Sequence, residues 1–252
     1  MRESLHAEWT KVRTVAGTGW LVLGMIVLTV AVGALVSTSV SPASSGAAQD
    51  TTKLALSGVD LGQAIAAVLG VLIIADEYRN GMIRITLAAV PRRLTMLGAK
   101  ACVVTALVMP AGVIAVAGSL LAGRPLLAGH GYPLASLAAG SSMRAAGGTV
   151  LYLGLIALLG LGVATALRDP GAAIGFVLGL LYLPIILGHV IGDPHLQRHI
   201  QQLSPMTAGQ SVQATVDVHR LPISPWAGLG VLAAWTAAAL VTGGLLLRAR
   251  DA

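Results

Sequence analysis

The chain has 252 residues, of which 56% are hydrophobic and only 10% are charged, with a formal net charge of +6 at pH 7. Soluble domains usually carry about 25% charged residues, so this composition excludes an ordinary water-exposed surface and indicates a membrane protein. The basic residues gather at the ends of apolar runs, which favours lipid headgroups over nucleic acid, and we expect no nucleic-acid partner.

Residues 1–15 form the first predicted element. Leu5, Trp9 and Val12 follow one another at i, i+4 and i+7, which places them on one face of a helix, with Glu3 on another face. Tryptophan is typical of the headgroup level of a membrane. The pattern therefore predicts an amphipathic helix that lies in the membrane interface. The alternative is an ordinary charged cap before the first span.

Six apolar runs follow, each about 20 residues long, which at 1.5 Å per residue is enough to cross the roughly 30 Å hydrocarbon core. Backbone groups in lipid must be satisfied internally, so these runs are expected to be helices. Five runs contain no Asp, Glu, Lys or Arg, and the second contains only Asp60. The sequence thus predicts an all-α membrane protein with one transmembrane domain over residues 1–252. Its predicted spans are about 16–37, 57–75, 101–122, 145–167, 171–191 and 226–247.

Lysine and arginine counts predict the orientation of these spans. If both ends of the chain lie on one side, the segments on the other side hold five of the 16 basic residues, namely Lys53, Arg124, Arg144, Arg198 and Arg220. The other eleven lie in the two terminal segments and in residues 76–100 and 168–170. The positive-inside rule then predicts a multi-pass protein with both termini, and residues 76–93, in the cytosol.

Residues 76–93, DEYRNGMIRITLAAVPRR, form a polar segment between the second and third runs. Gly81 can interrupt the extension of the second span, because glycine adopts left-handed dihedral angles without steric cost. Pro91 disfavours helix in the residue before it and ends the segment. Residues 83–90 place their apolar side chains on one helical face, although 83–87 also alternates like a strand. An isolated strand would leave its edges unpaired, so a short helix is favoured.

The charged side chains of this segment favour a surface that docks another protein. They are Asp76, Glu77, Arg79, Arg84, Arg92 and Arg93. The apolar face of the short helix would contact a partner, and the arginines would contact lipid or another protein. The alternative is that the arginines only hold the segment in the cytosol, with the acids as their counterions.

The remaining connections differ in character. Residues 38–56 are small and polar and predict a flexible loop, and residues 123–144 are rich in Gly and Leu without clear periodicity. Residues 192–225 contain two helix starts, Asp193-Pro194 and Ser204-Pro205, each followed by apolar residues at helical spacing. They predict two short amphipathic helices at the outer interface, with a solvated loop as the alternative.

Three further features are candidates for sites. Asp60 is an acid one turn inside the second span, which fits either a place on a transport pathway or a side chain that simply reaches water. His195 and His199 have the i, i+4 spacing of metal ligands, but polar surface histidines are favoured and no metal site is predicted. Gly175 and Gly179 form a small-xxx-small pair, for which we expect a packing seam within the chain rather than a contact between copies.

Taken together, three stretches resemble the permease subunits of the ATP-binding-cassette type-2 exporter family, most closely its actinobacterial members. The stretches are AEWTKVRT (7–14), GVDLGQAIAAVLGVLIIADEYRNGMIRITLAAVPRR (58–93) and Lys100 just after it. The resemblance covers the whole chain in span count, but its specific motifs end near residue 100. It implies an N-terminal connecting helix, six spans, a coupling helix between spans two and three, and re-entrant helices between spans five and six.

By this resemblance, Glu77, Tyr78, Arg79 and Gly81 fall in the region that couples the permease to a separate ATPase. We extend the predicted coupling site to the rest of the charged segment, that is to Asp76, Arg84, Pro91 and Arg92. The resemblance also implies the plasma membrane of a bacterium and a second permease, identical or different, that completes the transporter.

The chain contains no Gly-Lys pair and therefore no phosphate-binding P-loop, so we expect a non-enzymatic subunit. ATP and Mg²⁺ would be held by the partner ATPase, and this chain would hold no cofactor. The expected function is export of a hydrophobic or amphipathic compound, such as a drug, antibiotic, lipid or peptide. The alternative is a stand-alone, ion-coupled carrier, which would need ionisable groups deep in its spans.

Overall fold

The computed structural model describes residues 16–39, 50–79, 93–129, 140–190 and 193–249, and within these ranges every regular element is a helix. Six of the helices are long and apolar enough to cross a membrane, as predicted. They are α2 (Ala16–Ser39), α4 (Val59–Arg79), α6 (Arg93–Gly129), α7 (Gly140–Leu167), α8 (Pro170–Val190) and α11 (Pro225–Ala249). The short elements are α3 (Thr51–Ala55), α9 (Pro194–Leu203), α10 (Pro205–Gln210) and the 3₁₀ turns η1 (Ser211–Gln213) and η2 (Val218–Arg220).

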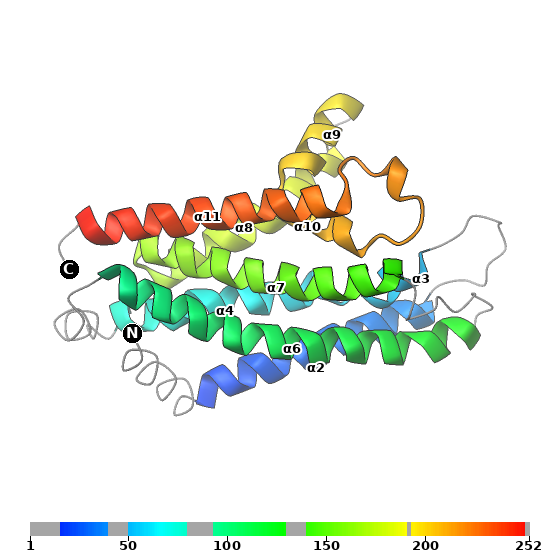
Figure 1. Cartoon of the computed structure of the whole chain (residues 1–252), viewed down its shortest axis with the longest axis horizontal. Helices are drawn as coiled ribbons and strands as arrows, with labels where there is room; N and C mark the ends of the chain where they lie inside the picture. Colours follow the sequence, from blue (N-terminus) through cyan, green and yellow to red (C-terminus); the bar gives the residue numbers. More distant parts are fainter. Residues whose placement is uncertain (1–15, 40–49, 80–92, 130–139, 191–192, 250–252) are drawn as a thin grey trace.

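The six long helices run side by side in one elongated bundle (Figure 1). Helix α2 begins and α11 ends at the same end of the bundle, which we call the terminal end. Helices α4 and α7 also end there, and α6 and α8 begin there. The opposite, distal end carries α3 and the connection from α10 to α11. This alternation of direction is the one expected for an even number of spans.

Helix α7 lies at the centre of the bundle and packs against α4, α6, α8 and α11. Its side chains Tyr152, Leu153 and Ile156 are fully buried. Lipid tails are as apolar as leucine, so association of such helices depends on close packing. At the crossing of α4 and α7, a Cβ atom on Gly70 would lie 1.9 Å from the carbonyl oxygen of Ala157. Only glycine permits that approach, and it fixes the separation of the two helices.

Two helices are longer than hydropathy indicates. Helix α6 covers 37 residues, about 55 Å at 1.5 Å per residue, and exceeds the hydrocarbon core at one or both ends. The Gly- and Leu-rich stretch 123–144, read from sequence as aperiodic, contributes residues to the ends of α6 and α7. A span predicted from hydropathy ends at a charged residue such as Arg124, whereas the backbone hydrogen bonds of the helix continue past that residue.

The connections at the distal end are more structured than their composition predicts. Within the stretch 38–56, predicted to be a flexible loop, residues 51–55 form α3, and Asp50 caps it by accepting a 3.0 Å hydrogen bond from the Lys53 amide. Asp50 also accepts hydrogen bonds from the amide and hydroxyl of Thr215 and from the amide of Val216. These long-range hydrogen bonds, which composition does not reveal, tie α3 to the segment before α11.

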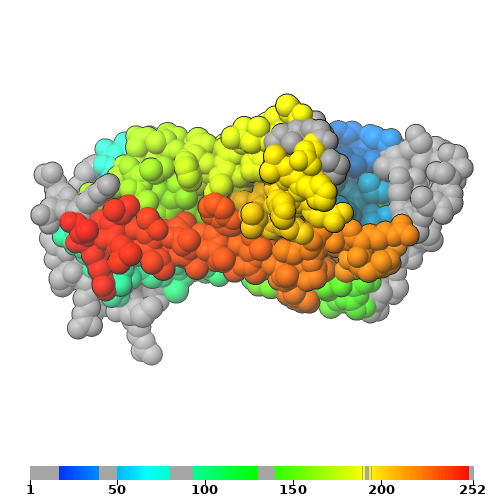
Figure 2. All heavy atoms as spheres, turned by 90° about the horizontal axis from the view of Figure 1, so that it is seen from above, coloured from blue at the N-terminus to red at the C-terminus, as the bar shows by residue number. Residues whose placement is uncertain are grey.

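Two short helices lie between α8 and α11, as the helix starts in the sequence predict. Asp193 caps α9 by accepting a 2.9 Å hydrogen bond from the His195 amide, with Pro194 in the first turn. Ser204 ends α9 and begins α10, so the chain turns there. Helix α10 is buried against α11 and contacts α7, whereas α9 projects from the bundle (Figures 1 and 2). That these helices re-enter a membrane stays a prediction.

Some predictions concern residues outside the part of the chain that the structure describes. They are the interfacial helix with Leu5, Trp9 and Val12, and the coupling helix with Gly81, Arg84, Pro91 and Arg92.

Candidate functional site

The last turn of α4 carries the first four residues of the predicted coupling site. Asp76 and Arg79 have side chains that are 45% and 67% exposed, and they form a 3.5 Å ion pair with each other. An exposed pair at this spacing contributes little stability, so both groups remain available to a partner. Glu77 and Tyr78 pack instead against the bundle. The turn therefore presents one charged pair outward and anchors itself with the other two side chains.

Glu77 forms a buried ion pair with Lys100 of α6. The Lys100 ammonium donates a 2.8 Å hydrogen bond to Glu77 Oε1 and a 3.1 Å hydrogen bond to the carbonyl oxygen of Ile73. The Lys100 and Glu77 side chains are only 1% and 8% exposed. Removing two charges from water is costly, and direct contact with additional hydrogen bonds offsets that cost. The pair holds the end of α4 against α6 two turns after α6 begins.

Tyr78 connects the same turn to α7. The guanidinium carbon of Arg168 lies 5.8 Å from the centre of the Tyr78 ring, within the range of a cation–π contact. Arg168 follows the last residue of α7 and has φ of 61°, a left-handed conformation that glycine usually provides at helix ends. This backbone conformation ends α7 and places an arginine, rather than a glycine, beside Tyr78.

The end of α11 completes the cluster. The last four carbonyl groups of a helix have no partner within it, and basic side chains are favourable there. Arg93, the first residue of α6, donates a 2.7 Å hydrogen bond to the carbonyl of Leu247, and Arg168 donates a longer one, 3.5 Å, to Leu246. Hydrogen bonds, the ion pair and the cation–π contact thus join the ends of α4, α6, α7 and α11. We call Glu77, Tyr78, Arg93, Lys100 and Arg168 the terminal cluster.

The terminal cluster flanks residues 80–92 on both sides, because α4 ends at Arg79 and α6 begins at Arg93. The contacts of the cluster join α4 and α6, which flank that segment in the chain, to α7 and α11. Sequence reasoning identified Glu77 and Arg93 among the charged residues of this segment, but it noted Tyr78 and Lys100 only through a family resemblance and gave Arg168 no role in a site. A lysine at the border of an apolar run is usually read as reaching the interface, although a buried one marks a specific partner.

Asp60, the possible pathway residue, lies at the distal end in the first turn of α4 and is exposed. The Gln210 side-chain amide donates a 2.6 Å hydrogen bond to its carboxylate, and the Tyr182 hydroxyl donates to its backbone carbonyl. One turn further in, Gln63 is fully buried, and its amide oxygen accepts a hydrogen bond from the Tyr152 hydroxyl. Four helices therefore meet in a polar network of which sequence reasoning found only Asp60.

The glycine pair of α8 does not behave as predicted. We expected Gly175 and Gly179 to form a packing seam within the chain, but among the described residues nothing lies within 4 Å of a Cβ placed on either. Glycines of other helices pack closely, as Gly70 of α4 does. On α7, a Cβ on Gly160 would lie 2.4 Å from a carbonyl oxygen of α4, and one on Gly162 would lie 2.7 Å from the α11 backbone. The α8 pair has the i, i+4 spacing of a packing motif and Gly160 and Gly162 do not, so the placement of neighbouring helices, and not the spacing, decides which glycines pack.

No family model matches the chain, and a search of curated proteins finds no match. The terminal cluster and the sequence around it therefore carry the functional inference.

Proposed function

We propose that this chain is the permease subunit of an ATP-driven exporter of the ATP-binding-cassette type-2 family. It moves a hydrophobic or amphipathic compound, such as a drug, antibiotic, lipid or peptide, across the plasma membrane of a bacterium. Transport proceeds by alternating access, powered by a separate ATPase that binds ATP and Mg²⁺. A second permease, identical or different, forms the other half of the transporter, and both termini of each chain lie in the cytosol.

The observation that supports this proposal best is that the last turn of α4 exposes two of its charged side chains and buries a third. Asp76 and Arg79 are exposed, and Glu77 is buried in an ion pair with Lys100. A turn that only determined topology would need the charges but not the buried pair. A coupling element needs both, because its outer groups must contact a partner and its inner groups must transmit the movement to the bundle.

The proposed mechanism follows from these contacts. When the ATPase subunits close on ATP, they displace residues 76–93 relative to the membrane. Glu77–Lys100 transmits this displacement to α6, Tyr78–Arg168 transmits it to α7, and Arg93 transmits it to the end of α11. The helices then tilt around the close contact of α4 and α7 at Gly70, and the exit at the distal end opens.

The test is co-purification of the chain with a cassette ATPase expressed beside it, followed by ATPase measurements in lipid nanodiscs. Asp76→Ala combined with Arg79→Ala removes the exposed charges without touching the buried pair. Interface residues of this kind contribute about 1–2 kcal/mol each, so coupled ATPase activity should fall roughly tenfold or more. Lys53→Ala, an exposed charge at the distal end, should leave activity unchanged and serves as the matched control. Failure of any ATPase to co-purify would contradict the proposal, as would full activity of the double variant.

One observation favours the alternative of a stand-alone, ion-coupled carrier. Glu77 and Lys100 are ionisable groups buried inside helices long enough to span a membrane, where such groups often mark ion pathways. The two functions differ in their energy source. Transport that collapses with a protonophore in vesicles without ATP would support the carrier, and transport that requires ATP and a second polypeptide would support the exporter.

A further inference from the structure

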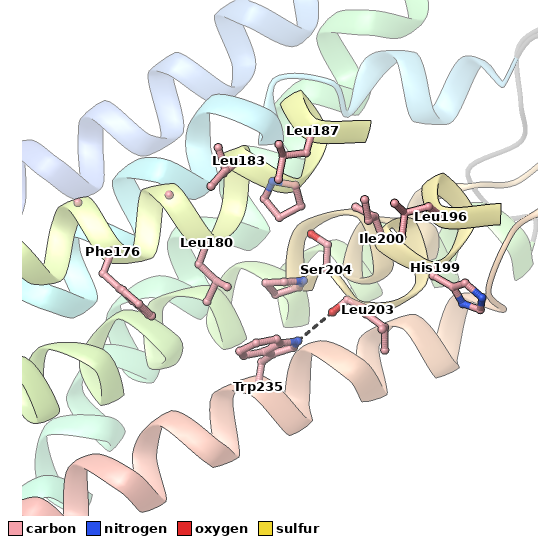
Figure 3. Close-up of a pocket in the computed structure, with 14 residues that line it drawn as sticks. Phe176, Leu180, Leu183, Leu187, Leu196, His199, Ile200, Leu203, Ser204 and Trp235 are labelled. Carbon is pink, nitrogen blue, oxygen red and sulfur yellow. Dashed lines mark hydrogen bonds between the residues drawn. The ribbon is translucent and has the colours of Figure 1, made fainter. Parts of the chain in front are cut away.

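Helix α8 is packed mainly through one face, and this packing weakens towards the distal end. Its fully buried residues Ala173, Val177 and Leu181 follow one another at i, i+4 and i+8, within the core shared with α4 and α7. An adjacent face borders an open groove of about 610 Å³ towards α9 and α11, where Phe176 and Leu187 are exposed (Figure 3). Beyond Leu181, no residue of α8 is buried among those whose side chains the structure describes. The distal part of α8 is therefore held less firmly than the rest.

Close backbone contacts fix the neighbours of α8 but not α8 itself. A Cβ on Gly209 of α10 would lie 2.7 Å from the Tyr152 ring of α7, and one on Gly228 of α11 would lie 2.0 Å from the carbonyl oxygen of Ala208 in α10. Together with the close contact of α4 and α7, these contacts make α4, α7, α10 and α11 one closely packed unit, against which α8 lies. Three glycines of α8 would meet nothing within 4 Å among the described residues, namely Gly175, Gly179 and Gly188.

Pro184 weakens α8 internally at the level where its burial ends. Proline has no N–H group, so the helical hydrogen bond to the carbonyl of Leu180 is missing. Helices kink most readily at such positions. The turn from Leu180 to Pro184 is therefore the place at which the distal part of α8 can bend relative to the rest of the helix.

Tyr182 lies within this turn and ties it to α4. Its hydroxyl donates a hydrogen bond to the backbone carbonyl of Asp60 and accepts a 3.3 Å hydrogen bond from the side-chain amide of Gln63. That amide also donates to the Asp60 carbonyl at 3.1 Å and to the Met206 sulfur at 3.0 Å, so Gln63 keeps partners when Tyr182 leaves. Tyr182 is half-buried beside the exposed Asp60, so water can replace the partners of the hydroxyl. Release of Tyr182 therefore leaves no buried group unsatisfied, which is the costly outcome.

We propose that Tyr182 is a latch that keeps the distal end of the bundle closed. While the latch is made, the Tyr182 hydroxyl holds α8 against the first turn of α4. When it is released, α8 bends at residues 180–184, and its distal part moves away from the closely packed unit of α4, α7, α10 and α11. The bundle then opens between α4 and α8. That this opening lets an exported compound leave rests on the proposed function, whereas the movement itself does not.

The distance between spin labels on α7 and α8 tests the latch. The labels are attached to Met143→Cys and Ile186→Cys, two exposed positions near the distal end, and Cys102→Ala removes the only native thiol. Electron–electron double resonance on the full-length chain in nanodiscs then gives the distance distribution, in which one population should dominate. Tyr182→Phe removes both hydrogen bonds of the hydroxyl and should raise the ratio of a longer-distance population to the first roughly tenfold, or about 1.4 kcal/mol. An unchanged distribution in Tyr182→Phe would overturn the proposal.

Tyr152→Phe is the matched control. It makes the same chemical change and also removes a hydrogen bond to Gln63, but it does so inside the closely packed unit, between α4 and α7. It should lower the Tm without adding the longer-distance population. If both variants gained that population, the change would be a general loosening of the bundle, and the latch would be refuted.

A third variant tests the position of the bend. Pro184→Ala, added to Tyr182→Phe, restores the N–H group that can bond to the Leu180 carbonyl and should reduce the longer-distance population at least threefold. A population that does not fall would show that α8 does not bend at this turn.

The latch and the proposed function can fail separately. If no ATPase co-purifies but Tyr182→Phe gains the longer-distance population, the exporter is refuted and the latch is supported. If an ATPase co-purifies and the distance distribution of Tyr182→Phe is unchanged, the latch is refuted and the exporter is supported.

Discussion

Replacing either member of the buried pair Glu77–Lys100 alone should destabilise the bundle strongly, whereas replacing both should not. At 2.8 Å and an effective dielectric constant of about 20, the attraction of the two charges is about 6 kcal/mol. Desolvation of the two ions costs several kcal/mol each, so the net contribution of the intact pair is close to zero. A single truncation removes the attraction but leaves the cost of one buried charge.

Glu77→Leu or Lys100→Met alone should therefore lower the free energy of unfolding by about 3–5 kcal/mol. For a chain of this size that corresponds to a fall in Tm of roughly 6–20 °C. The double variant Glu77→Leu/Lys100→Met keeps similar volumes without either charge, and its Tm should lie within a few degrees of the wild type. The measurement is thermal unfolding in nanodiscs, monitored by the helical circular dichroism signal.

The double-mutant cycle on Glu77 and Lys100 tests whether the two charges interact. If the two charges interact as the structure shows, the effects of the single variants are strongly non-additive. Additive losses would mean that the side chains act independently and that the ends of α4 and α6 are held by apolar contacts alone. Single variants with an unchanged Tm would mean that both groups reach water, and the proposed transmission path through Lys100 would be lost with them.

The other predictions concern packing, the distal end and topology. Gly70→Ala places a Cβ 1.9 Å from a carbonyl oxygen of α7 and should lower the free energy of unfolding by about 1–3 kcal/mol or more. Gly98→Ala is the control, because nothing lies within 4 Å of a Cβ at that position, and it should leave the stability unchanged. The Tm of each variant in nanodiscs measures the effect. Asp50→Ala removes the cap of α3 and the hydrogen bonds to the segment before α11, so amide exchange should accelerate in both segments and not at the terminal end. In a cysteine-free background, an impermeant maleimide should label Lys53→Cys but not Arg79→Cys in intact cells. The reverse pattern would invert the proposed orientation.

Much of the fold follows from the sequence because membrane helices are specified locally. Roughly 20 apolar residues without charge predict a helix wherever they lie, and the two helix starts at Asp193 and Ser204 predict α9 and α10. The same local rules predict that the second span ends in a charged segment, since Asp76 and Glu77 interrupt an apolar run. They fail at helix ends, where α6 continues past charged residues that hydropathy treats as boundaries.

The sites depend on partners that lie far apart in the chain. Lys100 looks like a border residue until α4 places Glu77 beside it, and Arg168 looks like part of a short turn until its left-handed backbone aims it at Tyr78.

The sequence by itself determined that this chain is helical, that six of its helices suit a membrane, and which helix ends carry charged residues. These properties depend on composition and on neighbours within a few residues. The tertiary structure decided which polar groups are buried together and which glycines pack. It also decided where space is left between helices, because these outcomes depend on distances between residues that are remote in the chain.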